Sequence, residues 1–472
     1  MSKVPYLMLL ICCLSLAQNK QVLYGFSEIP QALMLNPGGD VKNDWYFGIP
    51  LLSHIHVSAG SSGSSAYDVF ADDGVNFNNK LKAAIYSMEA NDFLTMNEQL
   101  ELFSGGFAFG DPYNKNKYLS FGLYKEFDFI SYFPKDAAVL AYEGNQNNNN
   151  RHFNASHLNV KAEALSVFHV GFQKKVNKQF TYGVRGKVYS SIAHASSTKN
   201  KGSFVTQTGE NNFYNHIFNL DLELQTSGLA SLLDDDNSEL KNDIKTLKNR
   251  LLFGGNLGLG FDVGFTYKWE DQWTVDGSLL DLGFITHTKD IKNFVLKGTY
   301  AFEGVDPFFS ESENNQTADE YWNAMEADFE DLFDVERNTT RYTSWRPVKL
   351  NASLNYAFGK KRFKACDCLH PQTNEYQNRV GAQLYAIKRP RSTQMALTGY
   401  YYRRLFKGLS AKATYTVDPY SFSNVGLGLS AHLGNVNFYL MADNFLAYQN
   451  IYNAQSVSLQ LGFNYIFKKN ED

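Results

Sequence analysis

The sequence lacks long hydrophobic runs. Beyond an apolar stretch near its start, none of its 472 residues belongs to a segment that approaches the roughly 20 apolar residues of a membrane-spanning helix. The mean hydropathy is -0.35. A basic stripe is also missing, because 44 Lys and Arg residues are interspersed with 48 Asp and Glu residues. The first absence argues against a helical membrane protein, and the second argues against nucleic-acid binding.

Cysteine is scarce, with four residues, and two of these lie in the N-terminal stretch MSKVPYLMLLICCLSLAQNK. A lysine, a short apolar run and small residues before Gln18 predict a secretory signal peptide over residues 1–17, cleaved after Ala17. Lipidation of Cys13 is the alternative interpretation of this stretch. After cleavage, Cys366 and Cys368 remain, so an exported chain of this size would be held together by its fold rather than by a disulfide framework.

What the sequence does contain is many aromatic residues, 15% of the chain, and long alternating runs. The stretch SVSLQLGFNYIF near the C-terminus alternates between apolar and polar residues, and the pattern recurs in YLSFGLYKEFDF, FTYGVRGKVYS, FNLDLELQ, NLGLGFDVGFTY and KLNASLNYAF. This period of two predicts strands with one apolar and one polar face. In the last strand we expect Leu459, Leu461 and Phe463 to face lipid, and Gln460 and Asn464 to face the interior.

The length and composition of these runs favour a membrane barrel over a soluble β-sandwich, the alternative all-β fold. The runs are about ten residues long, which a tilted membrane strand needs, whereas ordinary strands average about five or six. Their polar faces are rich in Gly, Ser, Asn and Asp, which suit a lumen crowded by a plug. We therefore predict an all-β protein, a transmembrane antiparallel β-barrel of the cell outer membrane over residues 45–472, with about 14 strands in a range of roughly 12 to 16.

Three segments depart from the strand pattern and are predicted as helical insertions near residues 76–102, 229–252 and 317–336. The third is strongly acidic and carries Trp322, Met325, Phe329 and Phe333 along one stripe, as an amphipathic helix does. This stripe is a candidate contact for a partner protein. The alternative is a helix that only fills a wide lumen or a loop.

Few residues suggest chemistry. His54 and His56 are two apart in a strand, so both should point into the lumen, but no third metal ligand follows at a fixed spacing. Arg185, Lys187 and Asp262 are further lumen candidates, which would set its polarity.

A second stretch, CDCLH, holds Cys366, Cys368 and His370, a weak pattern for a soft metal. The sequence has no G-x-S-x-G motif. We predict no metal, no cofactor and no enzymatic activity.

The stretch EIPQALMLNPGGD precedes the first predicted strand and carries Asn36, Pro37 and Gly38. It resembles the Asn-Pro-Ala element near the mature N-terminus of the FadL-like outer-membrane barrels, with Gly38 in place of the usual Ala. The stretches LLDLGFI, SNVGLGLSAHLGNVNFYLMADNFLAY and LGFNYIF are similar to signatures of the PorP/SprF and PorV-type barrels of Bacteroidota, and the chain most resembles a Bacteroidota barrel family of unknown function. The FadL resemblance implies that residues 18–44 form a hatch in the lumen, held by Asn36, Pro37 and Gly38.

Two functional hypotheses follow. In the first, small hydrophobic or amphipathic molecules cross the outer membrane through the lumen when the hatch opens. In the second, which the PorP/SprF and PorV resemblance implies, the chain is a non-conducting scaffold or accessory barrel of a secretion, surface-attachment or gliding apparatus, and its outer loops bind partner proteins. An integral-membrane enzyme is a third alternative, for which no set of residues argues.

Overall fold

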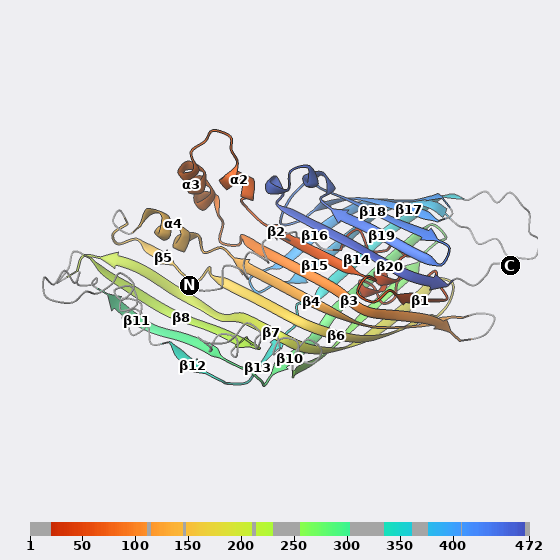
Figure 1. Cartoon of the computed structure of the whole chain (residues 1–472), viewed down its shortest axis with the longest axis horizontal. Coiled ribbons are helices and arrows are strands. Elements are labelled where there is room, and N and C mark those ends of the chain that lie inside the picture. The colour runs from red at the N-terminus through yellow and green to blue at the C-terminus, as the bar shows by residue number, and fades with distance from the viewer. Residues whose placement is uncertain are drawn as a thin grey trace, which may run out of the picture.

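The computed structural model describes residues 20–110, 115–144, 148–209, 214–229, 255–302, 335–360, 376–406 and 408–467. In these ranges, twenty strands join into one sheet with antiparallel pairings. The sheet curls and closes on itself, so that most of the chain forms one barrel (Figure 1). The chain is therefore nearly all-β, as its alternating runs predict.

Fourteen strand positions of the described chain close the barrel. Going around the ring, they are occupied by β1 (Trp45–Gly48) together with β2 (Ile55–Ser61), β3 (Phe93–Phe109), β4 (Lys117–Tyr132), β6 (Asn159–Lys175), β7 (Phe180–Gln207), β9 (Asn256–Lys268), β10 (Trp273–His287), β14 (Lys349–Lys360), β15 (Tyr376–Lys388), β16 (Thr393–Phe406), β17 (Leu409–Val417), β18 (Asn424–Leu433), β19 (Val436–Asp443) and β20 (Ser456–Phe467). The ring closes because β20 pairs with both β1 and β2. The predicted fold class and strand number are confirmed.

Two positions in the ring are occupied by interrupted strands. β1 and β2 both lie between β20 and β3, so together they make one strand with a break at residues 49–54. In the same way, β13 (Tyr342–Trp345) and β14 follow each other along β10, with a break at residues 346–348.

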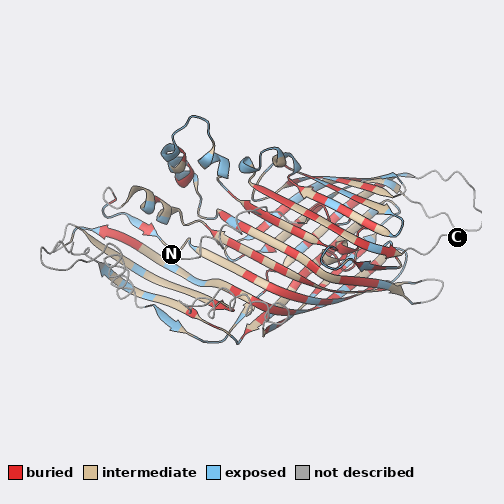
Figure 2. Ribbon diagram, in the orientation of Figure 1, coloured by how far each residue is buried: buried red, intermediate tan, exposed pale blue. Residues whose placement is uncertain are grey.

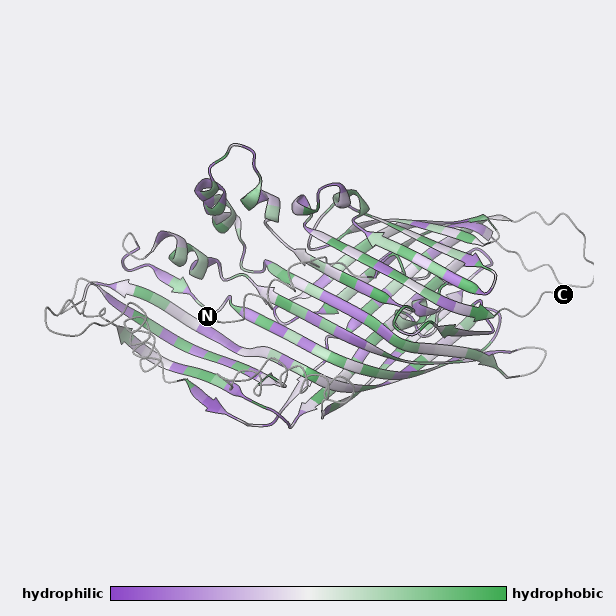
Figure 3. Ribbon diagram, viewed as in Figure 1, coloured by the Kyte–Doolittle hydropathy of each residue, from purple (hydrophilic) through white to green (hydrophobic). Residues whose placement is uncertain are grey.

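Successive side chains alternate between the outside and the lumen, which Figure 2 shows as alternating bands of burial along the strands. In β20, Gln460 and Asn464 point inward and are fully buried, while Leu459, Leu461 and Phe463 lie on the other face. The outward positions are apolar and well exposed, as at Leu257, Leu259 and Phe261 of β9. Figure 3 shows the matching alternation of hydropathy. An apolar outer wall around a polar lumen is the arrangement of a barrel that sits in lipid.

The two ends of the barrel differ. At one end, here called the turn end, several pairs of successive strands are joined by tight turns, such as residues 176–179, 269–272 and 434–435. At the other, here called the loop end, β7 continues beyond the ring: its residues 180–191 pair with β9, and its residues 194–207 pair with β8 (Asn215–Ser227). β5 (His152–Asn154), β11 (Asn293–Phe302) and β12 (Glu336–Asn338) widen this extension (Figure 1). Short turns at one end and long connections at the other are typical of outer-membrane barrels.

The loop end also carries α2 (Ala66–Phe70), α3 (Phe77–Ser87), α4 (Lys135–Glu143), η2 (Phe445–Gln449) and η3 (Ile451–Asn453). A capping box between Ser65 and Asp68 begins α2, and the side chain of Asn76 caps α3. None of the helices in the described ranges is long and apolar enough to cross a membrane.

The prediction of a helix near residues 76–102 is wrong for the second half of this range. α3 ends at Ser87, and residues 93–102 belong to β3, which pairs with β2 on one side and β4 on the other. A helix at this position would leave the backbone of both neighbouring strands unpaired in lipid, at several kcal/mol per group. Of the predicted helices near 229–252 and 317–336, almost every residue lies outside the described ranges.

Candidate functional site

The lumen is filled by the chain's own N-terminal segment, residues 20–44, here called the plug. Its side chains Val22, Leu23, Phe26 and Ile29 are almost completely buried and pack against inward residues of β16 and β19. Each such side chain contributes roughly 1.5–3 kcal/mol to docking, before the entropy of ordering the segment is subtracted. A one-turn helix, η1 (Pro30–Met34), forms the centre of the plug. The plug coincides with the hatch segment that the resemblance implies.

The predicted hatch residues, Asn36, Pro37 and Gly38, lie against the lumen wall. The side-chain amide of Asn36 donates to the carbonyl oxygen of Phe265 in β9, over 3.1 Å. Its side-chain oxygen accepts from the backbone N–H of Gly38, over 2.9 Å, which fixes the turn. The side-chain amide of Gln173 in β6 donates to the carbonyl oxygen of Pro37, over 3.2 Å. The three residues are therefore held by hydrogen bonds from two different strands.

A pair of glycines makes room for this turn. Gly183 of β7 and Gly264 of β9 face each other across the β-ladder. A Cβ atom on Gly183 would lie 1.9 Å from the carbonyl oxygen of Pro37, and one on Gly264 would lie 2.1 Å from the side-chain oxygen of Asn36. Both separations are far below van der Waals contact, so only glycine at both positions lets the plug approach the wall this closely.

The three charged lumen candidates lie together, next to the same turn. Arg185 donates through Nε to Asp262, over 2.6 Å, and through Nη1 and Nη2 to the carbonyl oxygens of Leu33 and Met34, over 3.0 and 2.6 Å. Lys187 contacts Asp262 over 3.0 Å. All three charged side chains are buried, so their mutual pairing offsets the cost of removing them from water. Arg185 thus joins the wall to the plug, which the sequence does not reveal.

Asp281 belongs to the same cluster and was not among the predicted residues. Its carboxylate accepts from Lys187 over 2.5 Å and contacts Lys349 over 2.8 Å. It stands at a bulge, with a positive φ of 59°. An acidic residue inside the apolar run LLDLGFI is the signal that could have pointed to it.

His54 and His56, the two histidines among the lumen candidates, are both buried on the inward side of the wall. His54 is hydrogen-bonded through Nδ1 to the hydroxyl of Tyr439, at 2.7 Å. In the described part of the chain, no group of three or more His, Cys, Asp or Glu side chains is arranged to hold a metal ion. These two histidines are therefore part of the polar lumen wall.

At the turn end, Glu28 anchors the plug. Its carboxylate lies 2.6 Å from the ammonium group of Lys42 and accepts from the hydroxyl of Tyr402 over 2.5 Å. Burial alone would raise the pKa of Glu28, but the nearby positive charges of Lys42 and Arg379 hold this pKa well below its usual range. Glu28 therefore stays ionised while the plug is docked.

The plug separates two cavities within the lumen. The upper cavity, toward the loop end, has a volume of about 110 Å³, and the lower cavity, toward the turn end, about 290 Å³. Met34 and Leu35 line the upper cavity, whereas the residues directly before and after them, Leu33 and Asn36, line the lower one. The partition between the cavities is thus a single layer of chain.

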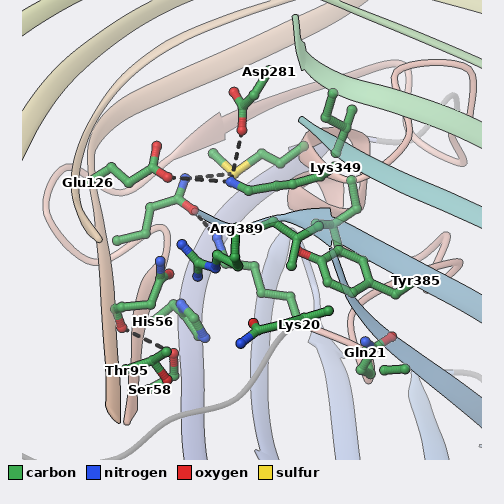
Figure 4. A pocket seen from close by; sticks show the side chains of 18 of the residues that line it. Lys20, Gln21, His56, Ser58, Thr95, Glu126, Asp281, Lys349, Tyr385 and Arg389 are labelled. Carbon is green, nitrogen blue, oxygen red and sulfur yellow. Dashed lines mark hydrogen bonds and ion pairs between the residues drawn. The ribbon is translucent and has the colours of Figure 1, made fainter. Parts of the chain in front are cut away.

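The upper cavity has two kinds of wall (Figure 4). Tyr385 and Ile387 of β15 form an apolar side, while Asn97 and Gln99 of β3 present amide groups. Lys349 lies between Glu126 and Asp281, so its charge is paired. A molecule in this cavity would therefore meet both apolar and hydrogen-bonding surface.

Trp322, Met325, Phe329 and Phe333 lie outside the described ranges, as do Cys366, Cys368 and the signal-peptide segment 1–17.

The fold and the plug define a class of protein, a transmembrane β-barrel of the outer-membrane type whose lumen is filled by its own N-terminal segment. The chain belongs to the Family of unknown function (DUF5723), whose model matches residues 37–443. A sequence search of curated proteins finds no match.

Several solved structures are similar. The Ralstonia pickettii toluene transporter TbuX has 9% identity and a TM-score of 0.42, with 93% of this chain and 94% of that chain covered. A Pseudomonas aeruginosa FadL homologue has 10% identity and a TM-score of 0.42, with 96% and 98% covered. The translocator domain of autotransporter NalP from Neisseria meningitidis has 9% identity and a TM-score of 0.29, with 89% of each chain covered.

Proposed function

We propose that this protein is an outer-membrane barrel that lets small amphipathic molecules pass when its plug moves. The observation that carries the proposal is the thin partition between the two cavities, in which Leu35 lines one cavity and Asn36 the other. Release of the plug from the wall, from Val22 to the turn at residues 36–38, would join the two cavities into one path along the lumen. The cavities lie on opposite sides of the plug, so no further tunnel through the wall is needed.

The lining favours an amphipathic passenger over a purely hydrophobic one. The upper cavity combines the apolar Tyr385 and Ile387 with the amides of Asn97 and Gln99. These amides are hydrogen-bonded within the protein, Asn97 to Asp128 and Gln99 to Lys20, so a passenger with a polar group can exchange hydrogen bonds with this wall, whereas a hydrocarbon cannot. A molecule with an apolar body and a polar group satisfies both walls.

The proposal is tested by tethering the plug with a reversible disulfide. A Cβ atom on Gly428 of β18 would lie 2.5 Å from Cγ1 of Val22, so the pair Val22→Cys and Gly428→Cys has the short separation that a disulfide needs. Both native cysteines outside the signal segment are replaced by Ser in every variant, and Val22→Cys alone is the matched control. Uptake by intact cells is followed with two probes that share one skeleton, N-phenyl-1-naphthylamine and the amphipathic 8-anilino-1-naphthalenesulfonate.

We expect the oxidised tether to reduce uptake of the sulfonate several-fold and a reductant to restore it, with no redox effect in the single variant. Equal uptake with the tether oxidised and reduced would reject passage through this lumen.

A second candidate function, an accessory barrel that binds partner proteins, is favoured by one feature. The sheet formed by β5, β8, β11, β12 and the second half of β7 extends beyond the closed ring, and passage through the lumen does not require it. Isolation in a mild detergent distinguishes the two functions. A partner protein present in a fixed ratio, together with uptake that ignores the tether, would favour the accessory role.

A further inference from the structure

Above the plug, side chains from opposite walls of the barrel meet inside the lumen. Arg389, which directly follows β15, donates to both carboxylate oxygens of Asp128 in β4, over 2.6 and 3.0 Å. Going around the ring, β4 and β15 are separated by five strand positions in one direction (β6, β7, β9, β10, β14) and by seven in the other. This bidentate pair is therefore a bridge across the lumen rather than a contact between neighbouring strands.

Further bridges run beside it. Arg346, in the break between β13 and β14, forms ion pairs with Glu126 of β4, at 3.0 Å, and with Glu163 of β6. Lys349 of β14 lies 3.4 Å from the same oxygen of Glu126. The side chains of Arg346, Glu126 and Glu163 are almost completely buried. The wall built by β4 and β6 is thus joined to the wall built by β14 and β15.

A tyrosine from the loop end completes the closure. In the connection between β17 and β18, the carboxylate of Asp418 accepts from the backbone N–H groups of Tyr420 and Ser421, each over 2.9 Å, and so fixes a turn. The hydroxyl of Tyr420 is hydrogen-bonded to Thr95 of β3, at 2.6 Å. Gly60 of β2 leaves a notch for this ring, because a Cβ atom there would lie 2.7 Å from it. Tyr420 also lines the upper cavity.

We propose that these bridges, here called the lumen seam (Arg346, Lys349 and Arg389 with Glu126, Asp128 and Glu163, and Tyr420 with Thr95), form a second gate in series with the plug. The upper cavity between the two gates is then a chamber that holds a small amphipathic molecule while both are closed. This inference rests on the proposed passage and adds to it a closure on the side of the loop end. Lys349 also pairs with Asp281, beside the plug, but the contacts Asp128–Arg389 and Thr95–Tyr420 include no residue of the plug, so they can open while the plug stays docked.

The test measures ionic current, because potassium chloride needs no specific recognition. The seam is weakened by the pair Asp128→Asn and Arg389→Gln, which removes both charges and leaves neither buried and unpaired, combined with Tyr420→Phe. The plug is loosened by Gly183→Ala. Lys388→Gln, a neutralisation at the exposed residue next to Arg389, is the matched control. Each full-length variant is reconstituted in planar bilayers, after its folding has been checked by heat-modifiable mobility on gels.

For two gates in series the open probabilities multiply. We therefore expect the weakened seam to raise the mean current by about tenfold in both plug backgrounds, and the combined variant to show the product of the two single effects. If the weakened seam leaves the current unchanged in both the wild-type and the Gly183→Ala background, while Gly183→Ala itself raises the current, the seam is not a gate. The proposed passage through the lumen is then retained. If Gly183→Ala has no effect even with the weakened seam, the passage itself is rejected.

Discussion

The contact between the plug and the glycine pair can be tested with one methyl group. In Gly183→Ala, the new Cβ would lie 1.9 Å from the carbonyl oxygen of Pro37 and 2.3 Å from its carbonyl carbon. A separation of at least 3.0 Å is required, so the backbone of the plug must retreat by about 1.1 Å, which is the difference between 3.0 and 1.9 Å. The obstructing atoms belong to a backbone, which cannot rotate away as a side chain can.

A retreat of that size breaks two of the neutral hydrogen bonds that hold the turn. The bond from Gln173 to Pro37 is 3.2 Å long and the bond from Asn36 to Phe265 is 3.1 Å long, so both would exceed hydrogen-bonding distance. Each contributes about 1 kcal/mol net. The loss of about 2 kcal/mol raises the population of the undocked plug about 30-fold, since 1.4 kcal/mol corresponds to a factor of ten.

Hydrogen–deuterium exchange of the backbone amides at residues 30–40, followed by mass spectrometry, measures that population. We expect exchange there to accelerate about 30-fold in Gly183→Ala, while the amides of β7 itself stay protected. Gly186→Ala is the matched control in the same strand, because its Cβ would meet nothing within 4 Å. Gly264→Ala should have the smaller effect, since its nearest clash is with the side chain of Asn36, which can rotate. Equal exchange of the plug in Gly183→Ala and Gly186→Ala would refute the docking geometry.

Three further predictions follow from other contacts. Arg185→Met leaves Asp262 buried with one fewer positive charge and removes both donors to the plug, so we expect a loss of about 3–5 kcal/mol, seen as a lower midpoint for heat-modifiable gel mobility. The pKa of Glu28 is lower in the docked plug than in a released one, so the carboxylate stabilises docking fully above the usual Glu pKa, and docking weakens as the pH falls below it. Hydrogen–deuterium exchange of the plug amides should therefore be slower in the wild type than in Glu28→Gln near pH 7, and the two rates should approach each other near pH 3. Phe261→Arg places a charge on the outer wall and should lower the free energy of unfolding, measured with urea in lipid vesicles, by about 2–4 kcal/mol. Phe70→Arg, in an exposed helix, should change this free energy by no more than about 0.5 kcal/mol.

The alternating runs predicted the wall of the barrel because their information is local. Side chains two apart point the same way in any strand, so the inward position of Gln460, Asp262 and His56 followed without knowledge of the neighbouring strands. The same reasoning failed for residues 93–102. Their apolar side chains also fit helical intervals, and only the need to pair β2 and β4 decides for a strand.

What could not be predicted depends on register. Asp128 and Arg389 are 261 residues apart in sequence, and whether they meet is decided by the stagger of every strand between them and by how closely the opposite walls approach. A shift of one residue in any of these pairings would turn one partner toward lipid. The same holds for Asp281, whose direction depends on a bulge in β10.

The plug lies between these two cases. Small polar residues on the inward faces indicate a crowded lumen, and the stretch EIPQALMLNPGGD indicates which segment enters it. Yet the sequence contains 35 glycines, and nothing local marks Gly183 and Gly264 as the two that receive the turn. They do so because they are paired with each other across β7 and β9. On either side of this pair, Gln173 of β6 pairs with Gly183, and Ser278 of β10 pairs with Gly264. Gln173 donates to Pro37, and Ser278 donates to the carbonyl oxygen of Leu35 over 2.6 Å. One row of four adjacent strands thus supplies two gaps flanked by two donors, so a change at any of the four positions should loosen the plug without disturbing the ladder that carries it.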